Sequence, residues 1–251
     1  MSKQNKDLFS NQLFQEWSKK EDLLPIEKYF LEKYLANKKG KVVEAGTGGG
    51  RIIFEIEKLG FTNLEAFDYV ESMISFCNVK KRHLNSSINF KNADATKLIP
   101  DYSEKEFDYL IYLQQVLCFL DKDLLPKALN EAYRVGKQDS IYIYSFLNWN
   151  SKFYNPILSI MVNFFRILRG EKTNKYELPW LILNEKINWK FLNKNQPQNI
   201  WFRKNRILDI LKKNGFSIIE VKSQVDTADK MGHYILPAKK PIKYKYNHLN
   251  V

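Results

Sequence analysis

The feature that most constrains the fold is a glycine-rich stretch, VVEAGTGGGRIIFEI, which spans residues 42–56. It begins with a short β-branched run, continues through four glycines within five positions, and ends in an amphipathic segment. Ile52, Ile56 and Leu59 recur at i, i+4 and i+7, so they share one face of a helix. The stretch therefore predicts a buried strand, a tight turn and a helix, with a ligand close to the turn at the positive end of that helix.

Two common phosphate-binding patterns do not fit this turn. A dinucleotide fingerprint is G-x-G-x-x-G, but reading from Gly46 puts Arg51 at the third glycine position, and reading from Gly48 puts Ile53 there. The glycine–lysine–serine or threonine end of a P-loop is also missing. The pattern that fits is E-x-G-x-G-x-G from Glu44, whose carboxylate can accept hydrogen bonds from an ammonium group and would repel a pyrophosphate. The turn favours a cationic, amino-acid-like ligand and makes a nicotinamide oxidoreductase a distant alternative.

Apolar runs that read as strands alternate with amphipathic runs that read as helices. The expected strands are residues 41–44, 64–67, 88–90, 107–113, 140–146, 217–221 and 233–237. The expected helices are residues 8–36, 51–59, 71–82, 124–135, 157–168 and 203–213. This alternation predicts right-handed βαβ units and a mostly parallel sheet covered on both faces, with the ligand at the carboxyl ends of the strands.

Two further carboxylates follow expected strands. Asp68 ends the second strand, where a carboxylate is placed to accept both hydroxyls of an unphosphorylated ribose, and the ring of Tyr69 can lie against a base. Asp94 follows the third strand and can accept from an exocyclic amine such as that of adenine. A simpler interpretation remains open for each aspartate: a helix cap for Asp68 and a turn residue for Asp94.

Several motifs occur in a fixed order: VVEAGTGGGR, FDYVESM, NADATKLIP, FDYLIYLQQVLCFL and LNEAYRVGK. Together they resemble class I S-adenosylmethionine-dependent methyltransferases over residues 41–147, with a weaker echo in residues 203–240. The resemblance implies an α/β, Rossmann-like fold with a seven-stranded, mostly parallel sheet whose last strand is antiparallel. One departure is RVGKQDS, where the family has a Pro-Gly-Gly-like turn; that loop is structural, so the site is unaffected.

The resemblance also implies S-adenosylmethionine as cofactor and S-adenosylhomocysteine as product. Glu44 and the turn 46–50 would hold the methionine part, Asp68 the ribose hydroxyls, and Tyr69 would flank the adenine. Asp94 and Ala95 would meet the adenine edge, while Leu113 and Gln114 would border the methionine and the methyl group. The complete expected set is Glu44, Ala45, Gly46, Thr47, Gly48, Gly50, Arg51, Asp68, Tyr69, Met73, Asp94, Ala95, Leu113 and Gln114.

A catalytic base is needed only for some acceptors. A hydroxyl acceptor must lose a proton, whereas an amine need only arrive neutral. Of the three histidines, His83 sits at a helix end and His248 in the tail, so His233, at the start of the antiparallel last strand, is the candidate base. A structural strand histidine is the simpler alternative for His233. We expect no metal site, because the chain has no paired cysteines or clustered histidines.

The chain divides into five parts: an N-terminal helical segment (1–40), a cofactor-binding core (41–147), an insert (148–202), a return to the core (203–240) and a tail (241–251), which we expect to be an edge extension or loose. The insert contains four of the five tryptophans and the apolar run ILSIMVNFFRIL. We expect that run to be the helix of a substrate-facing lid over the pocket. Contact with lipid or a hydrophobic substrate, and a dimer interface, remain alternatives.

The net charge of +12 bears on possible partners. The lysines are spread in short clusters beside Asn, Ile or Tyr, which favours an ordinary solvated surface, with a polyanion or peripheral membrane role as the alternative. Cys77 and Cys118 make no disulfide framework, and neither a membrane span nor a signal peptide is expected, so we expect a cytoplasmic protein.

Three functions therefore remain open. The first is methyl transfer to a small-molecule acceptor, at an O or N atom in preference to C or S. The second is an RNA or protein methyltransferase that uses the basic surface. The third is a non-catalytic cofactor-binding module. The oligomeric state is left open.

Overall fold

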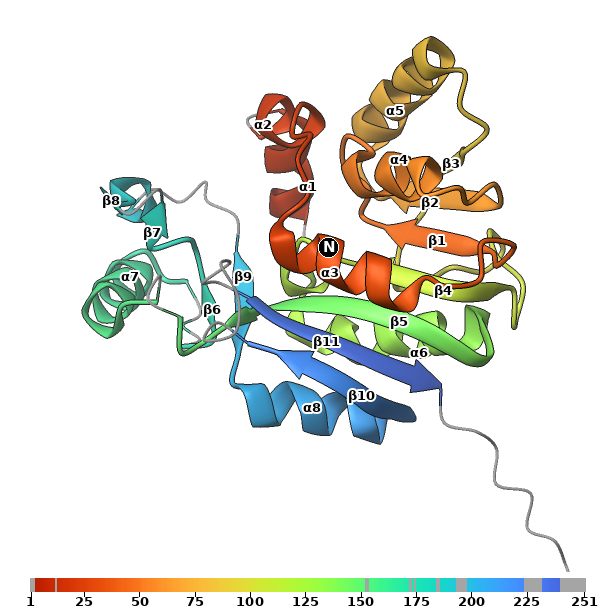
Figure 1. Cartoon of the computed structure of the whole chain (residues 1–251). Coiled ribbons are helices and arrows are strands. Elements are labelled where there is room, and N and C mark those ends of the chain that lie inside the picture. Colours follow the sequence, from red (N-terminus) through yellow and green to blue (C-terminus); the bar gives the residue numbers. More distant parts are fainter. Residues whose placement is uncertain are drawn as a thin grey trace, which may run out of the picture.

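The protein is described by a computed structural model that covers residues 3–11, 13–151, 154–171, 173, 175–183, 186–192, 198–223 and 232–239. In this part of the chain the main sheet has nine strands, seven of them in the order β10-β11-β5-β4-β1-β2-β3 (Figure 1). These seven are β1 (Val42–Ala45), β2 (Leu64–Asp68), β3 (Asn89–Asn92), β4 (Phe107–Tyr112), β5 (Gly136–Asn148), β10 (Phe216–Lys222) and β11 (Gly232–Lys239).

The strand directions confirm the expected fold class. β1 is parallel to β2 and β4, β2 is parallel to β3, and β4 is parallel to β5. β11 is antiparallel to both of its neighbours, β5 and β10. The seven-strand count is too small, because β9 (Asn199–Phe202) pairs in parallel with the end of β5, and β6 (Glu177–Leu178) pairs with β9.

Helices cover both faces of the sheet, as predicted. On one face lie α3 (Pro25–Tyr34), α4 (Arg51–Lys58) and α5 (Glu71–Leu84); on the other lie α6 (Leu125–Val135) and α8 (Lys204–Lys213) (Figure 1). Side chains alternate between the faces along a strand. Tyr142 and Tyr144 accordingly pack under α6 and α8, whereas Ile143 packs in the core on the α3 side.

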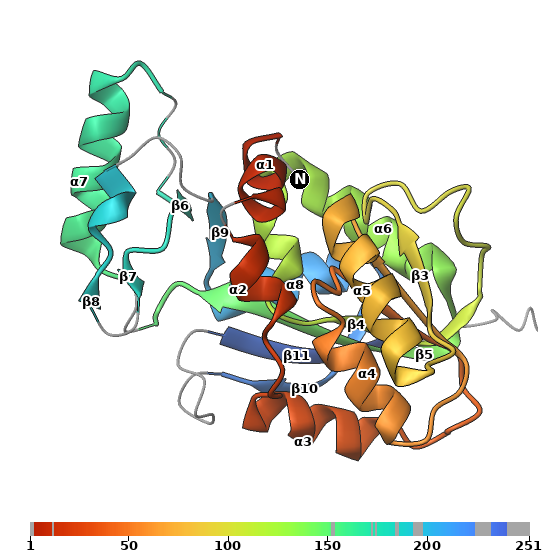
Figure 2. The same ribbon diagram turned by 90° about the horizontal axis from the view of Figure 1, so that it is seen from above.

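The expected single helix over residues 8–36 is wrong. The structure has three helices there: α1 (Lys3–Ser10), α2 (Phe14–Ser18) and α3, and Pro25 begins α3 as expected. Leu24 is extended, with φ −68° and ψ 147°, because a residue before proline is disfavoured in the helical region. The break lets α1 and α2 leave the sheet and contact α5 (Figure 2).

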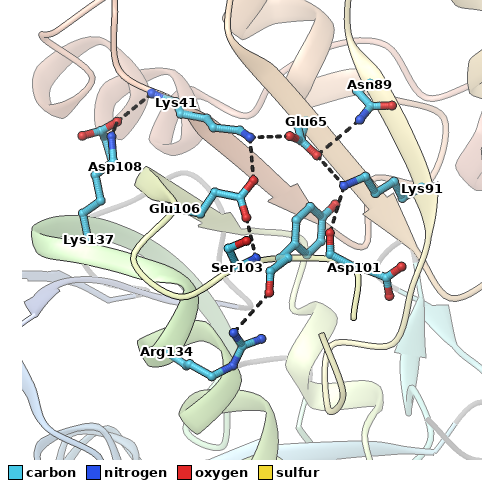
Figure 3. A network of polar contacts seen from close by, with 11 residues as sticks. Lys41, Glu65, Asn89, Lys91, Asp101, Ser103, Glu106, Asp108, Arg134 and Lys137 are labelled. Carbon is cyan, nitrogen blue, oxygen red and sulfur yellow. Dashed lines mark hydrogen bonds and ion pairs between the residues drawn. The ribbon is translucent and has the colours of Figure 1, made fainter. Parts of the chain in front are cut away.

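Lysine and carboxylate side chains form a network of ion pairs near the amino ends of the strands (Figure 3). The Nζ of Lys41 lies 2.5 Å from a carboxylate oxygen of Glu65 and 2.6 Å from one of Glu106. The Nζ of Lys91 lies 3.1 Å from the other oxygen of Glu65. We call this group the amino-edge network; its members are Lys41, Glu65, Lys91, Glu106, Asp108 and Lys137. It ties β1, β2, β3, β4 and β5 together at the edge away from the glycine turn.

The insert forms one end of the molecule (Figures 1 and 2). Its described elements, besides β6 and β9, are α7 (Pro156–Leu168), the hairpin of β7 (Ile182–Leu183) and β8 (Lys186–Ile187), and the short 3-10 helix η3 (Trp189–Leu192). In the described part of the chain, no helix is long and apolar enough to cross a membrane. The tail 241–251 and the expected turn between the last two strands lie outside the described residues, apart from Ser223 and Gly232.

Candidate active site

The glycine-rich stretch folds as predicted into the end of β1, a turn and the start of α4. The Gly46 amide donates to the Phe67 carbonyl oxygen at 2.8 Å, so β1 and β2 stay joined into the turn. Gly46 has φ +64°, and a Cβ on it would lie 2.1 Å from Cγ2 of Val116. A Cβ on Gly49 would lie 2.1 Å from the carbonyl oxygen of Ser18. Glycine is required at both positions, because two other segments of the chain lie directly against the turn.

A pocket of about 990 Å³, its open mouth included, lies at the carboxyl ends of β1, β2 and β4. Most of the predicted cofactor residues line it: Glu44, Gly46, Thr47, Gly48, Arg51, Asp68, Tyr69, Met73, Asp94, Ala95 and Gln114. Ala45, Gly50 and Leu113 are not part of the lining. Ala45 and Leu113 are buried in the two cores, and Gly50 is the N-cap of α4.

Glu44 lies at the bottom of the turn, 3% exposed. Its Oε2 accepts hydrogen bonds from the Thr47 hydroxyl at 2.6 Å and from the Ile53 amide at 3.1 Å. Burial raises the pKa of the Glu44 carboxyl to about 8, and these two donors, together with the charge of the nearby Arg51 guanidinium, only partly oppose the shift. Within the described residues, no cation forms an ion pair with Glu44. A positively charged ligand group would therefore favour its ionised form.

Asp68 is held by backbone amides. Its Oδ2 accepts from the Gly48 amide and its Oδ1 from the Val70 amide, both at 2.9 Å. Burial raises the pKa of Asp68 despite these bonds. The helix-cap interpretation is wrong, because Val70 occupies the N-cap position of α5. Since a carboxylate has about four acceptor positions, two remain for a ligand.

The neighbours of Asp68 along the pocket wall are positioned by local contacts. Asp94 Oδ1 accepts from both the amide and the hydroxyl of Thr96 at 2.8 Å, so Asp94 does close a turn while it lines the pocket. The Nζ of Lys6, from α1, lies 4.5 Å from the ring centroid of Tyr69. This cation–π contact anchors α1 over one side of the pocket.

Arg51 and Gln114 belong to a hydrogen-bonded chain that reaches back to the N-terminal segment. Arg51 forms a two-pronged pair with the fully buried Glu27, at 2.6 and 3.0 Å. The Gln114 amide donates to Glu27, and the Nζ of Lys20 donates to Oε1 of Gln114 at 3.0 Å. Gln114 also has φ +54°, an uncommon value for a residue other than glycine. Its side chain is therefore fixed in direction at the end of β4 by contacts on both sides.

The residues that cover the pocket were not among those predicted from the sequence. Phe9, Trp17 and Lys20 come from the N-terminal segment, and further lining residues surround the 3-10 helix η1 (Val116–Phe119): Val116, Leu117, Phe119 and Leu120. The signal for the first group was the aromatic residues of the N-terminal segment, Phe9, Phe14 and Trp17. The position of Phe9, Trp17 and Lys20 over the turn depends on the interruption of the helix before Pro25, which separates α2 from α3.

No described residue of the insert lines this pocket. The insert instead reaches the pocket cover through Asn5, whose amide donates to the carbonyl oxygens of Phe119 at 3.0 Å and Gln198 at 3.1 Å. A substrate-facing lid at 148–202 thus stays a prediction.

The backbone of His233 lies at the same edge of the sheet. It is paired with Phe146 near the end of β5, but its side chain lies outside the described residues. Its role as a base therefore stays a prediction. Among the residues that the structure describes, no group of three or more His, Cys, Asp or Glu side chains is placed to hold a metal ion.

The sheet order and the glycine turn, with buried carboxylates at the ends of β1 and β2, are typical of the cofactor site of a Rossmann-like protein. The family of methyltransferase domains matches residues 36–215, so the chain belongs to this family, the class I S-adenosylmethionine-dependent methyltransferases. No curated protein sequence matches the chain.

Solved structures share the fold at low sequence identity. A 1,6-didemethyltoxoflavin-N1-methyltransferase from Burkholderia thailandensis, bound to 1,6-didemethyltoxoflavin and S-adenosylhomocysteine, is 13% identical with a TM-score of 0.64, covering 94% of this chain and 87% of its own. An S-adenosylmethionine-dependent methyltransferase from Methanosarcina mazei is 18% identical with a TM-score of 0.64, covering 88% and 99%. A cyclase is 14% identical with a TM-score of 0.60, covering 86% and 80%. The same fold thus occurs with different reactions, and the acceptor must be inferred from the site.

Proposed function

We propose that this chain binds S-adenosylmethionine in the pocket over the glycine turn and transfers its methyl group to an oxygen or nitrogen atom of a small molecule. One observation carries the proposal. Glu44 and Asp68 are buried carboxylates that line the same pocket, and their described hydrogen-bond donors are all neutral. Such carboxylates suit an ammonium group and a pair of ribose hydroxyls, which are the donor groups of the methionine and ribose parts of this cofactor.

The other predicted residues fit the rest of the cofactor. Tyr69 and Met73 line the wall where an adenine would lie, and Asp94 and Ala95 line the part that would meet its edge. Gln114, held by Lys20 and Glu27, would border the methionine part. The glycine turn leaves room for a ligand because it carries no side chain beyond Thr47.

The bound cofactor supplies a methyl group that is already electrophilic. The protein's task is to align the acceptor and to exclude water. Phe9, Trp17 and Phe119 form apolar pocket walls that suit both tasks. For a hydroxyl acceptor we assign proton removal to His233; a neutral amine needs no such base.

The cover formed by α1 and α2 favours a small acceptor, because it leaves a pocket where a polymer would need an open groove. A cytoplasmic setting suits the two buried free thiols, Cys77 and Cys118. The alternative acceptor, RNA or protein, is supported by a separate cleft lined by Arg203, Lys204, Arg206 and Lys213. That alternative requires polyanion binding that weakens steeply with salt.

Calorimetric titration with S-adenosylhomocysteine, with NAD as the control, tests the cofactor assignment. We expect S-adenosylhomocysteine to bind and NAD to give no heat of binding. Binding of neither ligand would leave the fold without its cofactor and favour the non-catalytic alternative. Methyl transfer to a panel of small hydroxyl and amine compounds then tests the acceptor. For a hydroxyl acceptor, a base at His233 predicts that activity falls toward acidic pH as the base takes up a proton, and His233→Ala should abolish this acid limb of the pH profile.

A further inference from the structure

Helix α7 is apolar on two opposite faces. Leu158 and Val162 are buried in the core under the sheet, so one face anchors the helix. The opposite face has five large apolar side chains at i, i+3, i+7, i+10 and i+11, all 56 to 71% exposed: Ile157, Ile160, Phe164, Ile167 and Leu168. On a helix this spacing places all five within roughly a third of the circumference. A contiguous apolar stripe of this kind marks an interaction surface.

Elements of the same insert also carry exposed apolar side chains. η3 contacts α7, and the guanidinium of Arg169 donates to the carbonyl oxygen of Leu192 at 2.7 Å, which holds η3 against the end of α7. Trp189 in η3 is 61% exposed, and Ile187 in β8 is 44% exposed. An exposed tryptophan is typical of a surface that meets the boundary between water and lipid.

The exposed charges of the segment that holds the stripe are of one sign. The exposed charged residues that the structure describes between positions 156 and 192 are all basic: Arg169, Lys175, Lys186 and Lys190. The described acidic residues of this segment, Glu171 and Glu177, are only partly exposed, and Glu171 is paired with Arg169 at 2.7 Å. An apolar stripe flanked by lysines and an exposed tryptophan matches the composition of a helix that lies in a membrane interface.

We propose that the face formed by α7, β8 and η3, the α7 face, docks on the surface of an anionic lipid bilayer. With 13 residues, α7 is too short to span a membrane, so it would lie in the plane of the interface. A second copy of the chain is the less suitable occupant. A two-fold contact would bring the same basic side chains of both copies together, and these would repel.

The position of the α7 face suits such docking. The insert lies at one end of the molecule, beyond β9 and away from α5 and β3 (Figure 2). The pocket lining includes none of the residues of the stripe, so lipid contact would leave the pocket mouth in place. This inference does not depend on methyl transfer.

Flotation with lipid vesicles tests the proposal. The full chain is mixed with vesicles of phosphatidylcholine alone or of phosphatidylcholine with phosphatidylglycerol. We expect binding to the anionic vesicles only, and at least about tenfold weaker binding for the double variant Ile160→Glu and Phe164→Glu, because two carboxylates would enter the apolar boundary. Lys186→Ala and Lys190→Ala should each weaken binding about fivefold.

The matched control is Ile219→Glu, which places the same charge at an exposed isoleucine of β10, in another part of the surface. It should float like the original chain, and unchanged thermal unfolding of all variants shows that they fold. Absence of flotation with anionic vesicles, or equal loss in the Ile219→Glu control, would overturn the proposal. A dimer in ultracentrifugation that the Ile160→Glu and Phe164→Glu variant dissociates would also overturn it, in favour of a second copy.

Discussion

The carboxylates at the two edges of the same sheet differ in their partners and in the direction in which their pKa values are shifted. At the amino edge, Glu65 and Glu106 share the ammonium group of Lys41. Burial opposes ionisation of Glu106, but the hydrogen bonds from Lys41 and the Ser103 amide, together with the charges of Lys41 and Lys91, outweigh it and lower the pKa. At the carboxyl edge, burial dominates, and the pKa values of Glu44 and Asp68 are raised.

The difference separates a stabilising role from a binding role. A carboxylate that already has a cation gains little from a ligand, whereas a buried carboxylate with neutral donors gains most when a cation or further donors arrive. The carboxyl edge is therefore less stable than it would be with ion pairs, and this is the property that a binding site requires. Four experiments test this contrast.

The largest effect is expected from Glu44→Gln as the pH changes. The pKa of Glu44 is about 8 in the folded chain, above its ordinary value of 4.5, so the folded state holds this proton more tightly than the unfolded state. Folding therefore loses stability from this group as the pH rises from about 4.5 to about 8. Glutamine stays neutral, so the variant should gain up to about 4 kcal/mol relative to the original chain across this range.

Thermal unfolding of the free protein against pH measures this difference. Glu106→Gln is the opposite control: because its folded pKa is lowered, the native carboxylate stabilises above its ordinary pKa, and the variant should lose stability there. Parallel pH curves for the Glu44→Gln variant and the original chain would refute the assignment for Glu44.

The second largest effect, a loss of folding stability, is expected from Glu65→Ala. Lys41 and Lys91 would lose a shared, largely buried partner, which should lower the free energy of unfolding by about 2 to 3 kcal/mol. Affinity for S-adenosylhomocysteine should not change. Urea denaturation and calorimetry measure the two quantities, and Glu55→Ala, which breaks an exposed pair with Lys58, should cost less than about 1 kcal/mol. A parallel loss of affinity in Glu65→Ala would contradict the separation of the two edges.

Asp68→Ala should mainly weaken cofactor binding and should affect folding stability less, which is the reverse of the result expected for Glu65→Ala. Unpaired ribose hydroxyls should cost about 1 to 3 kcal/mol of binding free energy, or roughly a 5- to 150-fold higher Kd for S-adenosylhomocysteine. Stability should fall less than in Glu65→Ala, because the freed amides of Gly48 and Val70 border the pocket, where water can reach them. Calorimetry checks the affinity, and Asp68→Asn, which keeps one acceptor oxygen, should recover part of it. Unchanged affinity in Asp68→Ala would refute the placement of the ribose.

The smallest effect is expected from Lys6→Ala. It removes the cation over the Tyr69 ring, a contact worth about 0.5 to 1 kcal/mol, and so loosens α1 over the pocket. We expect affinity for S-adenosylhomocysteine to fall about two- to fivefold. Lys6→Arg, which keeps the cation, should retain the affinity. If the two variants weaken binding equally, the charge over the ring is not what holds the cover.

Local pattern was sufficient for the elements next to the glycine turn. The β-branched run, the glycines and the i, i+4, i+7 spacing of α4 are properties of a few consecutive residues, and each was predicted close to its observed bounds. β5 was less accurate: it was expected at 140–146 but spans 136–148, because Asp139 adopts φ +62° and the pairing with β4 shifts between Phe107 and Tyr109. A positive φ at a residue other than glycine has no reliable sequence signal.

The sequence by itself determined the order of strands and helices in the core 41–147, the turn and half of the residues that line the pocket. Only the tertiary structure decided what covers that pocket, through the contact of Ser18 with Gly49 and the pair of Glu27 with Arg51. It also decided how the insert joins the sheet, through the pairing of β9 with β5. The physical reason is the separation along the chain of the residues that interact. Periodicity and turn chemistry act between neighbours along the chain, whereas these contacts join segments that are brought together only when the whole core forms.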